Sequence, residues 1–160
     1  MELEHVDRIT AGAVGEPGER TFFLQAREGD RLVTILVEKE QVELLGTSIL
    51  EILATVGRET GEGPPSDELG LEPPLEPLWR AGRLSIGYAE ERDRMLLEIE
   101  ELVEEDEISP QERLGEQPEE PVEASAPADE GLEPARLRLW ATREQMLALA
   151  RHGATVAARG

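Results

Sequence analysis

Residues 20–38 read RTFFLQAREGDRLVTILVE, the most apolar and most regularly patterned stretch of the chain. Along residues 21–26 the side chains alternate with a period of two, which indicates a β-strand. Residues 28–30 (Glu-Gly-Asp) are a turn sequence, and residues 32–37 are rich in β-branched residues and carry apolar side chains on both faces. The stretch therefore predicts a β-hairpin whose second strand is buried on both sides.

The residues on either side of this hairpin extend it to three strands and a helix. His5–Val14 has the pattern of a first strand, and the sequence Gly15–Gly18 (GEPG) supplies the turn into the hairpin. After the hairpin, apolar side chains recur at steps of three and four over Lys39–Val56. This is the pattern of an amphipathic helix, which Gly57 is placed to cap. Residues 5–57 thus predict a β-β-β-α unit.

The second half of the chain repeats this order with longer interruptions. Residues 58–77, rich in proline and glycine, predict a loop that crosses to a strand at residues 78–89. Residues 91–104 are ambiguous, because their apolar side chains recur at helical spacing while part of the segment also alternates as a strand does. A last strand is predicted at residues 136–141, followed by a helix at residues 142–158 that begins with a capping threonine.

An acidic insert precedes the last strand. Residues 106–133 are rich in glutamate and proline, a composition that predicts a disordered, charge-expanded segment. We expect one domain over residues 1–160, with a first repeat at about 5–57 and a second at about 78–159.

Weak similarity between the halves favours a doubled unit. Arg8–Ala13 matches Arg83–Tyr88, and Arg20–Leu24 matches Arg94–Glu98 in position. Because this alignment sets the ambiguous segment opposite a strand, it favours a strand there. Each unit exposes an apolar sheet face, so the two are expected to join in one sheet or to pack face to face. The predicted fold is α+β, a mostly antiparallel sheet of about six strands from two β-β-β-α repeats, with two helices packed on it.

The composition argues against several classes of function. The chain carries 36 acidic and 16 basic residues, a formal net charge of −20, and its only lysine is Lys39. It therefore lacks the clustered basic residues that binding to nucleic acid or to an anionic membrane requires. It has no cysteine, which removes disulfides and thiol chemistry. Neither a membrane-spanning apolar run nor a signal-peptide pattern is present, so we expect a cytoplasmic protein.

Four residues are candidates for a ligand site. The glycine-rich loop Gly12–Gly18 offers backbone N–H groups to a phosphate, but it lacks the lysine of a phosphate-binding loop and leads to a strand, so a plain hairpin turn is the simpler interpretation. If a cleft exists, the residues expected to meet in it are Gly15, Arg20, Glu38 and Arg83. Structural roles compete for them, because arginines form salt bridges in so acidic a chain and Glu38 can stabilise a helix N-terminus.

No catalytic or metal-binding grouping is apparent in the sequence. His5 and His152 are the only histidines and are far apart, whereas a metal site needs clustered ligands. Carboxylates are too abundant for one pair to be singled out as acid and base. We therefore predict no metal and no cofactor, and an enzyme is the less favoured class.

The segment Ala11–Arg27 (AGAVGEPGERTFFLQAR) strongly resembles an uncharacterised bacterial family, common in actinobacteria and designated DUF3090. Val37–Lys39 and the leucine-rich strand near Arg138 fit the same pattern, so the resemblance covers nearly the whole chain. It implies no activity, but members look like partners of neighbouring histidine-phosphatase-like and lipid-kinase-like proteins. Members usually continue into a Cys-Pro-x-Cys tail resembling a zinc knuckle, whereas this sequence ends at Gly160, so a metal role of that tail is not carried over.

Two functions compete at this point. The first is a non-catalytic binding or adaptor protein whose acidic surface engages a basic protein partner, with no role for nucleic acid or membrane. The second is a small-ligand binding protein or enzyme that uses the Gly12–Gly18 loop, nearby arginines and Glu38 for a phosphate-containing ligand. The sequence does not distinguish oligomeric states.

Overall fold

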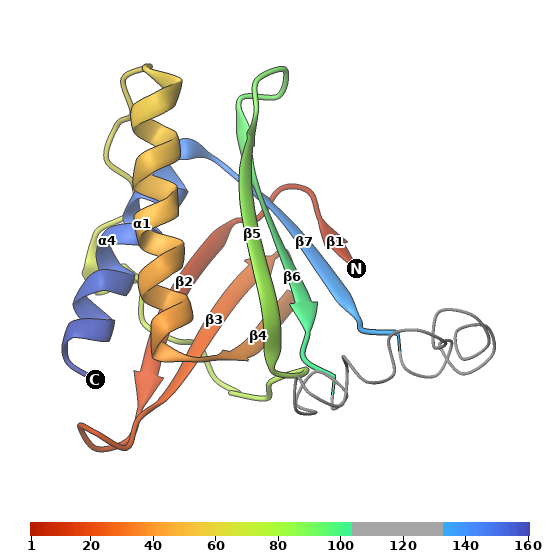
Figure 1. Cartoon of the computed structure of the whole chain (residues 1–160), viewed down its shortest axis with the longest axis vertical. Helices are drawn as coiled ribbons and strands as arrows, with labels where there is room; N and C mark the ends of the chain where they lie inside the picture. Colours follow the sequence, from red (N-terminus) through yellow and green to blue (C-terminus); the bar gives the residue numbers. More distant parts are fainter. Residues whose placement is uncertain (104–132) are drawn as a thin grey trace, which may run out of the picture.

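The computed structural model describes residues 1–103 and 133–160 (Figure 1). After a two-residue first strand, the order of these elements is three strands and a helix, twice. The elements are β1 (Glu2–Leu3), β2 (Arg8–Val14), β3 (Thr21–Glu28), β4 (Arg31–Val37), α1 (Lys39–Val56), the 3-10 helix η1 (Ser66–Glu68), β5 (Ala81–Ala89), β6 (Arg94–Glu101), β7 (Arg136–Ala141) and α4 (Arg143–Ala158). The predicted α+β class is confirmed.

β2, β3 and β4 form an antiparallel sheet in chain order, as the hairpin sequences predict. Leu24 lies opposite Ile35 and Ala26 opposite Val33, so these four buried side chains share the inner face of the sheet. Gln25 points to the other face, yet it is only 2% exposed. Both faces of this sheet are therefore covered, which agrees with the apolar pattern of β4.

A second sheet has the strand order β1-β7-β6-β5, with β1 parallel to β7 and the other pairs antiparallel. The segment of ambiguous pattern is strand β6, because Met95, Leu97 and Ile99 are buried at every second position while Glu98 is exposed. In a helix, Leu97 would lie on the opposite side from Met95 and Ile99. The predicted strand is confirmed.

The chain crosses from one sheet to the other at two places, and backbone hydrogen bonds connect the sheets there. The backbone N–H of Val6 donates to β7 (3.3 Å) and that of Asp7 to β3 (2.8 Å). Just ahead of β5, the N–H of Leu78 donates to β4 (2.8 Å). The sheets face each other (Figure 1), and side chains from both enclose a void of only about 10 Å³, so the core between them is closely packed.

The two helices pack on each other, with α1 beside β5 and α4 beside β2 (Figure 1). Small residues permit the close approach, since a Cβ added at Gly46 would lie 3.4 Å from the carbonyl oxygen of Ala150. Gly57 caps the C-terminus of α1 with a φ of 71°. The Thr142 hydroxyl caps α4 by accepting from the N–H of Gln145 (3.0 Å). Both helices have the bounds and caps that the sequence predicts.

Part of the predicted loop crosses the outer face of the three-stranded sheet as an ordered strap, which we define as residues 69–72. The carbonyl oxygen of buried Leu69 accepts the Thr10 hydroxyl (2.6 Å). The Gln25 carboxamide pairs with the Glu72 backbone in both directions, donating to its carbonyl oxygen (2.9 Å) and accepting from its N–H (2.7 Å). The strap therefore supplies the partners that buried Thr10 and Gln25 need.

Some features differ from the prediction or lie beyond it. The strands, about six in the prediction, form two facing sheets of four and three strands, the second of the two arrangements left open by the sequence, because the chain changes sheets at residues 6–7 and 78–80. The short strand β1 has no counterpart in the prediction. The predicted disordered insert, residues 106–133, lies outside the described residues except at its end. Within residues 1–103 and 133–160, every helix is too short or too polar to cross a membrane.

Candidate functional site

Two of the four predicted site residues, Gly15 and Arg20, lie in the turn between β2 and β3. Gly15 has a φ of 116°, a conformation that favours glycine. N–H groups that a phosphate would need here are already engaged, because Gly18 donates to the carbonyl oxygen of Gly160 (2.8 Å) and Glu19 donates within the turn (2.8 Å). The geometry is that of a hairpin connection docked on the end of α4.

The other two, Glu38 and Arg83, lie on neighbouring elements, at the start of α1 and on β5. The Glu38 carboxylate binds Arg80, just ahead of β5 (2.7 Å). The N–H of Glu38 donates to the Gln41 side chain (2.7 Å), which in turn donates to the carbonyl oxygen of Ala81 (3.3 Å). These contacts fix the first turn of α1 to the first residue of β5, and the turn between β2 and β3 takes no part in them.

A hollow of about 300 Å³, the lower hollow, lies between α1 and β5. Leu44 on its helix wall is 66% exposed, the highest value among the large apolar side chains of the described residues. Arg83 lies on its strand wall and is exposed. The residues that line the lower hollow are Gln41, Leu44, Leu45, Ser48 and residues 82–86.

A second hollow of about 530 Å³, the upper hollow, follows between the same two elements. Its walls combine apolar side chains of α1 with the Tyr88 ring and with charged groups at the rim. The residues that line it are Glu51, Ile52, Thr55, Val56, Arg58, Tyr88 and Glu90. Because the lower hollow uses residues 41–48 of α1 and the upper one residues 51–56, the two form one groove, which we call the α1–β5 groove.

The strand wall of the groove is a sheet edge. Within residues 1–103 and 133–160, β5 is the outermost strand of its sheet, with nine residues, and β6 pairs with it on one side only. The other sheet edges are short, paired or covered. β1 has two residues, β4 pairs with residues 78–80, and β2 lies against α4. β5 is thus the long edge that meets the open groove.

A cluster of polar side chains closes the upper end of the groove, in the turn between β5 and β6. One carboxylate oxygen of Asp93 accepts hydrogen bonds from the Tyr88 hydroxyl (2.7 Å) and from Nε of Arg143 (2.8 Å), and Arg58 lies 3.3 Å from the same oxygen. Arg143 and Tyr88 hold the pKa of Asp93 well below its usual range. Asp93 also has a φ of 51°, which is uncommon for a residue other than glycine.

Arg143 ties this cluster to the chain beyond α1. It is 7% exposed, and its Nη1 donates to the carbonyl oxygen of Glu59 (2.9 Å) and to the Thr60 hydroxyl (2.8 Å). The hydrogen bond to Asp93 raises the pKa of Arg143. Because these side chains bind one another, the cluster is suited to positioning the end of the groove rather than to moving protons.

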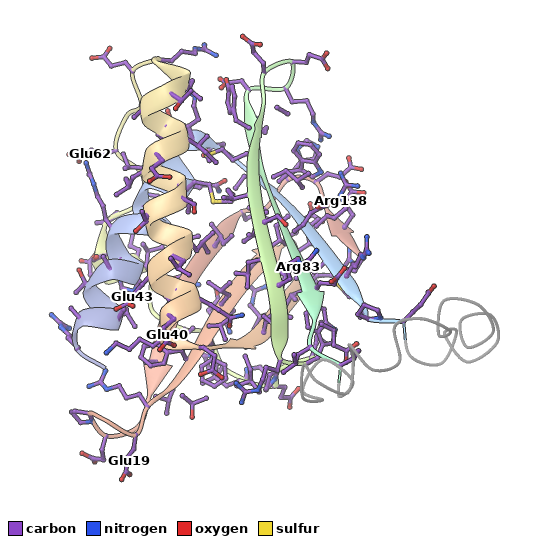
Figure 2. The ribbon with its side chains drawn as sticks, in the orientation of Figure 1. Glu19, Glu40, Glu43, Glu62, Arg83 and Arg138 are labelled. Carbon is purple, nitrogen blue, oxygen red and sulfur yellow. The ribbon has the colours of Figure 1, made fainter. Side chains whose placement is uncertain are left out.

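The outer face of the four-stranded sheet carries alternating charges. Arg83, Glu100 and Arg136 lie opposite one another in register, and in the next row Glu98 faces Arg138 (Figure 2 labels Arg83 and Arg138). Glu100 binds Arg136 at 2.9 Å and Glu98 binds Arg138 at 3.5 Å. The opposite charges along this face are largely balanced, as on a solvated surface.

The two histidines do not form a metal site. Over residues 1–103 and 133–160, His, Asp and Glu side chains form no group of three suited to a metal ion. The Nδ1 atom of His152 is 3.2 Å from the Ser66 hydroxyl, and burial lowers the pKa of His152. This contact tethers η1 to α4.

Sequence reasoning missed most of the α1–β5 groove. One signal was present, because Leu44 lies off the predicted core stripe of α1 and is a large apolar side chain on a polar helix face. Nothing in the sequence singled out Asp93 as a site residue, because its partner Arg143 is 50 residues away in the chain. The groove itself depends on which strand forms the sheet edge, and strand order is not visible in the alternation of side chains.

The model of one protein family, described as "Protein of unknown function (DUF3090)", matches residues 1–160. The chain therefore belongs to the DUF3090 family, as the resemblance in the sequence indicates. Comparison with the curated proteins and with the solved structures found no match.

Proposed function

We propose that this member of the DUF3090 family is a non-catalytic protein-binding module that receives part of a partner protein in the α1–β5 groove. The observation that supports the proposal is an open groove in which the exposed Leu44 and the half-buried Ile52 and Ile86 line hollows of about 300 and 530 Å³. Apolar surface held open to solvent is a feature of binding sites.

The charge of the chain favours a basic partner. A formal net charge of −20 steers positively charged molecules toward the surface over long range. The helix wall adds to this locally, because Glu40 is exposed on α1 one turn before Leu44 (Figure 2) and Glu51 and Glu90 stand at the rim of the upper hollow. A partner segment with lysine or arginine would meet complementary charge at these carboxylates, while Arg83 and Arg58 are the basic side chains that line the groove.

The groove offers little for catalysis in the part of the chain that the structure describes. A general base has to accept a proton near neutral pH. Asp93, beside the upper hollow, has a pKa far below that range and is held by Arg143 and Tyr88. These contacts support binding over acid–base chemistry.

The alternative, a phosphate-containing ligand bound by the Gly12–Gly18 loop, has less support. The N–H of Gly18 is engaged by Gly160. A Cβ at Gly12 would lie 2.5 Å from the Leu71 side chain, so the strap covers the start of that loop. We therefore favour the groove as the binding surface.

A pair of leucine substitutions on the same helix tests the groove. Leu44→Asp changes a groove residue, whereas Leu50→Asp changes a leucine that is 47% exposed and does not line either hollow. A partner captured from cells that express the protein natively would be identified, purified and titrated against both variants by calorimetry. We expect Leu44→Asp to weaken binding at least ten-fold, about 1.4 kcal/mol or more, and Leu50→Asp to leave it within about two-fold.

Two results would contradict the proposal. One is equal affinity of both leucine variants for the purified partner. The other is a thermal shift with phosphorylated metabolites that survives Leu44→Asp and is lost in Arg20→Ala, because this would favour the glycine-rich loop. Urea unfolding of each variant shows whether it is folded at the temperature of the titration.

A further inference from the structure

The geometry points to a binding mode for the groove, and this inference rests on the proposed function. We infer that the partner enters as an extended strand that pairs with the open edge of β5. We further infer that its sequence alternates apolar residues with lysine or arginine. The partner class is thus a short basic β-strand segment of another protein.

The edge of β5 lacks the features by which proteins protect sheet edges. Such edges are usually short, covered, or interrupted by proline and several charges. β5 has nine residues, AGRLSIGYA, with Arg83 as its one charge and no proline, and the single irregularity in its pairing is at its start, between Ala81 and Arg83. Every second residue of an edge strand turns its N–H and C=O away from its own sheet. Residues 84–89 therefore present a regular set of backbone groups to the groove.

The helix wall supplies a surface for one face of an added strand. Side chains of a strand alternate between two faces. Beside β5, one set would meet Leu44, Leu45 and Ile52 of α1, and the other set would face solvent. Leu84, Ile86 and Tyr88 of β5 are only half-buried, so a new strand would also cover part of them. The first set is therefore expected to be apolar.

The acidic side chains beside the groove favour lysine or arginine at the solvent-facing positions of the added strand. They also argue against a second copy of this chain as the bound segment. Glu40 and Glu51 precede and follow Leu44 at helical spacing on the solvent-facing rim of α1, and both are exposed. Glu90 adds a further carboxylate at the upper end. Lysine or arginine in the intervening positions would neutralise these groups. A second copy would instead bring another net charge of −20 to the same surface.

Backbone methylation of a peptide tests strand pairing directly. The probe is an N-acetylated, fluorescein-labelled peptide of about ten residues in which valine alternates with arginine, long enough to span β5. Two methylated versions carry N-methyl groups on alternate amides, one on the valines and the other on the arginines. In an added strand, one of these two sets of N–H groups faces β5 and the other faces solvent. Binding to the full chain would be followed by fluorescence anisotropy.

The expected result is asymmetric. One methylated peptide should bind at least about ten-fold more weakly than the parent, and the other within about two-fold. A control peptide with the same composition but with its valines and arginines in two blocks should also bind at least about ten-fold more weakly. Amide hydrogen exchange of β5 should slow when the parent peptide is bound.

The outcomes separate the binding mode from the proposed function. Equal binding by the two methylated peptides overturns strand pairing. If Leu44→Asp still weakens the binding of the parent peptide in that case, the groove is retained as the binding surface. Equal binding of the parent peptide to Leu44→Asp, Leu50→Asp and the unchanged protein overturns the groove itself. The inference that the partner segment alternates apolar and basic residues is overturned by either of two results. One is that the parent peptide does not bind at millimolar concentration, and the other is that the block peptide binds as tightly as the parent. Dimerisation with protection of β5 in the absence of peptide would make a second copy the occupant.

Discussion

At the scale of single residues, Arg143 and Asp93 hold together parts of the chain that are distant in sequence. Arg143 starts α4 and is nearly buried, while Asp93 occupies the turn between β5 and β6. Their 2.8 Å contact, with Tyr88 and Thr60 around it, fixes the turn to the helix. The upper end of the α1–β5 groove therefore depends on the Asp93 carboxylate, which forms ion pairs with Arg143 and Arg58.

The substitution Asp93→Asn should destabilise the fold in a way that depends on pH. The pKa of Asp93 is lowered in the folded chain, so its stabilising charge is present above the unfolded pKa of about 3.9 and is lost as the pH falls toward the folded value. The difference in free energy of unfolding between the unchanged protein and the variant should be full at neutral pH and shrink below about pH 4. Urea unfolding from neutral to acidic pH measures it.

The matched control is Glu91→Gln, which changes an exposed carboxylate in the same turn. Asparagine tolerates the left-handed backbone conformation, so Asp93→Asn adds little strain. A difference that stays constant across the pH range would show that hydrogen-bond geometry, and not the charge of Asp93, carries the effect.

Some single-residue features follow from the sequence because they are local. Gly57 and Thr142 act as caps within one turn of the helices they end or begin, so residue type and position are sufficient to predict them. The contacts of Gln25 are different, because its partner Glu72 is 47 residues away. A polar residue in an apolar alternation indicates only that some partner exists.

At the scale of elements, the strap covers the outer face of the three-stranded sheet, so both faces of that sheet are buried. It lies on Gly12 through Leu71 and binds Gln25 through Glu72. The Glu72 carboxylate also bridges Arg8 (3.1 Å) and Arg27 (2.6 Å), and the side-chain hydrogen bond from Arg27 lowers the pKa of Glu72. Apolar packing and charge pairing thus hold the same four residues in place.

The close fit of the strap on Gly12 gives a double-mutant prediction. A Cβ at Gly12 would lie 2.5 Å from Cγ of Leu71, so Gly12→Ala should displace the strap and cost about 1–3 kcal/mol in free energy of unfolding. Leu71→Ala alone should cost about 1–2 kcal/mol, because the leucine is half-buried. In the double variant the added methyl has room, so the loss should be smaller than the sum of the single losses by about 0.5 kcal/mol or more.

Urea unfolding of the four proteins measures this coupling. Gly87→Ala is a suitable control, because a Cβ at Gly87 would meet no atom within 4 Å. Strictly additive losses in the double variant would show that the strap does not rest on Gly12.

The elements themselves were largely predictable, because periodicity is a local property. The helical stripe of α1 identifies its element, whereas the period of β6 was ambiguous and the alignment of the two halves favoured a strand there. β1 was beyond this reasoning, since two residues show no period and its pairing with β7 joins positions 136 residues apart. The division into two sheets likewise rests on backbone contacts of Val6 and Leu78 that no pattern encodes. The internal sequence repeat stays a prediction.

At the scale of the whole molecule, charge is the dominant property. The chain has 36 acidic and 16 basic residues. Most ion pairs of the described residues are partly exposed, such as Glu38 with Arg80, and such pairs contribute little in water. The folded chain therefore carries an uncompensated repulsion that is larger than in the expanded unfolded chain.

Salt should stabilise this protein. Raising sodium chloride from about 20 mM to about 300 mM shortens the Debye length from about 20 Å to about 6 Å, which screens the repulsion. The midpoint of thermal unfolding should rise by about 3 °C for each kcal/mol that is regained in a chain of this size. Calorimetric scans over this range of salt measure the shift.

Choline chloride should act like sodium chloride, since screening depends on ionic strength and not on the cation. A midpoint that falls with salt would mean that the surface ion pairs outweigh the repulsion. A rise with sodium alone would indicate specific binding of that ion.

The parallel pairing of β1 with β7 has a consequence for how the protein is made. Leu3 is fully buried beside Leu139, so this contact forms only after the residues around position 139 have been synthesised. Loop closure over such a separation is slow, and apolar segments without their cover are prone to associate with other chains. Residues 8–56, whose strands and helix pair with near neighbours in sequence, can order first during translation. During synthesis, β1 should therefore remain without its partner until β7 has been made, and this is the stage at which a chaperone would bind it.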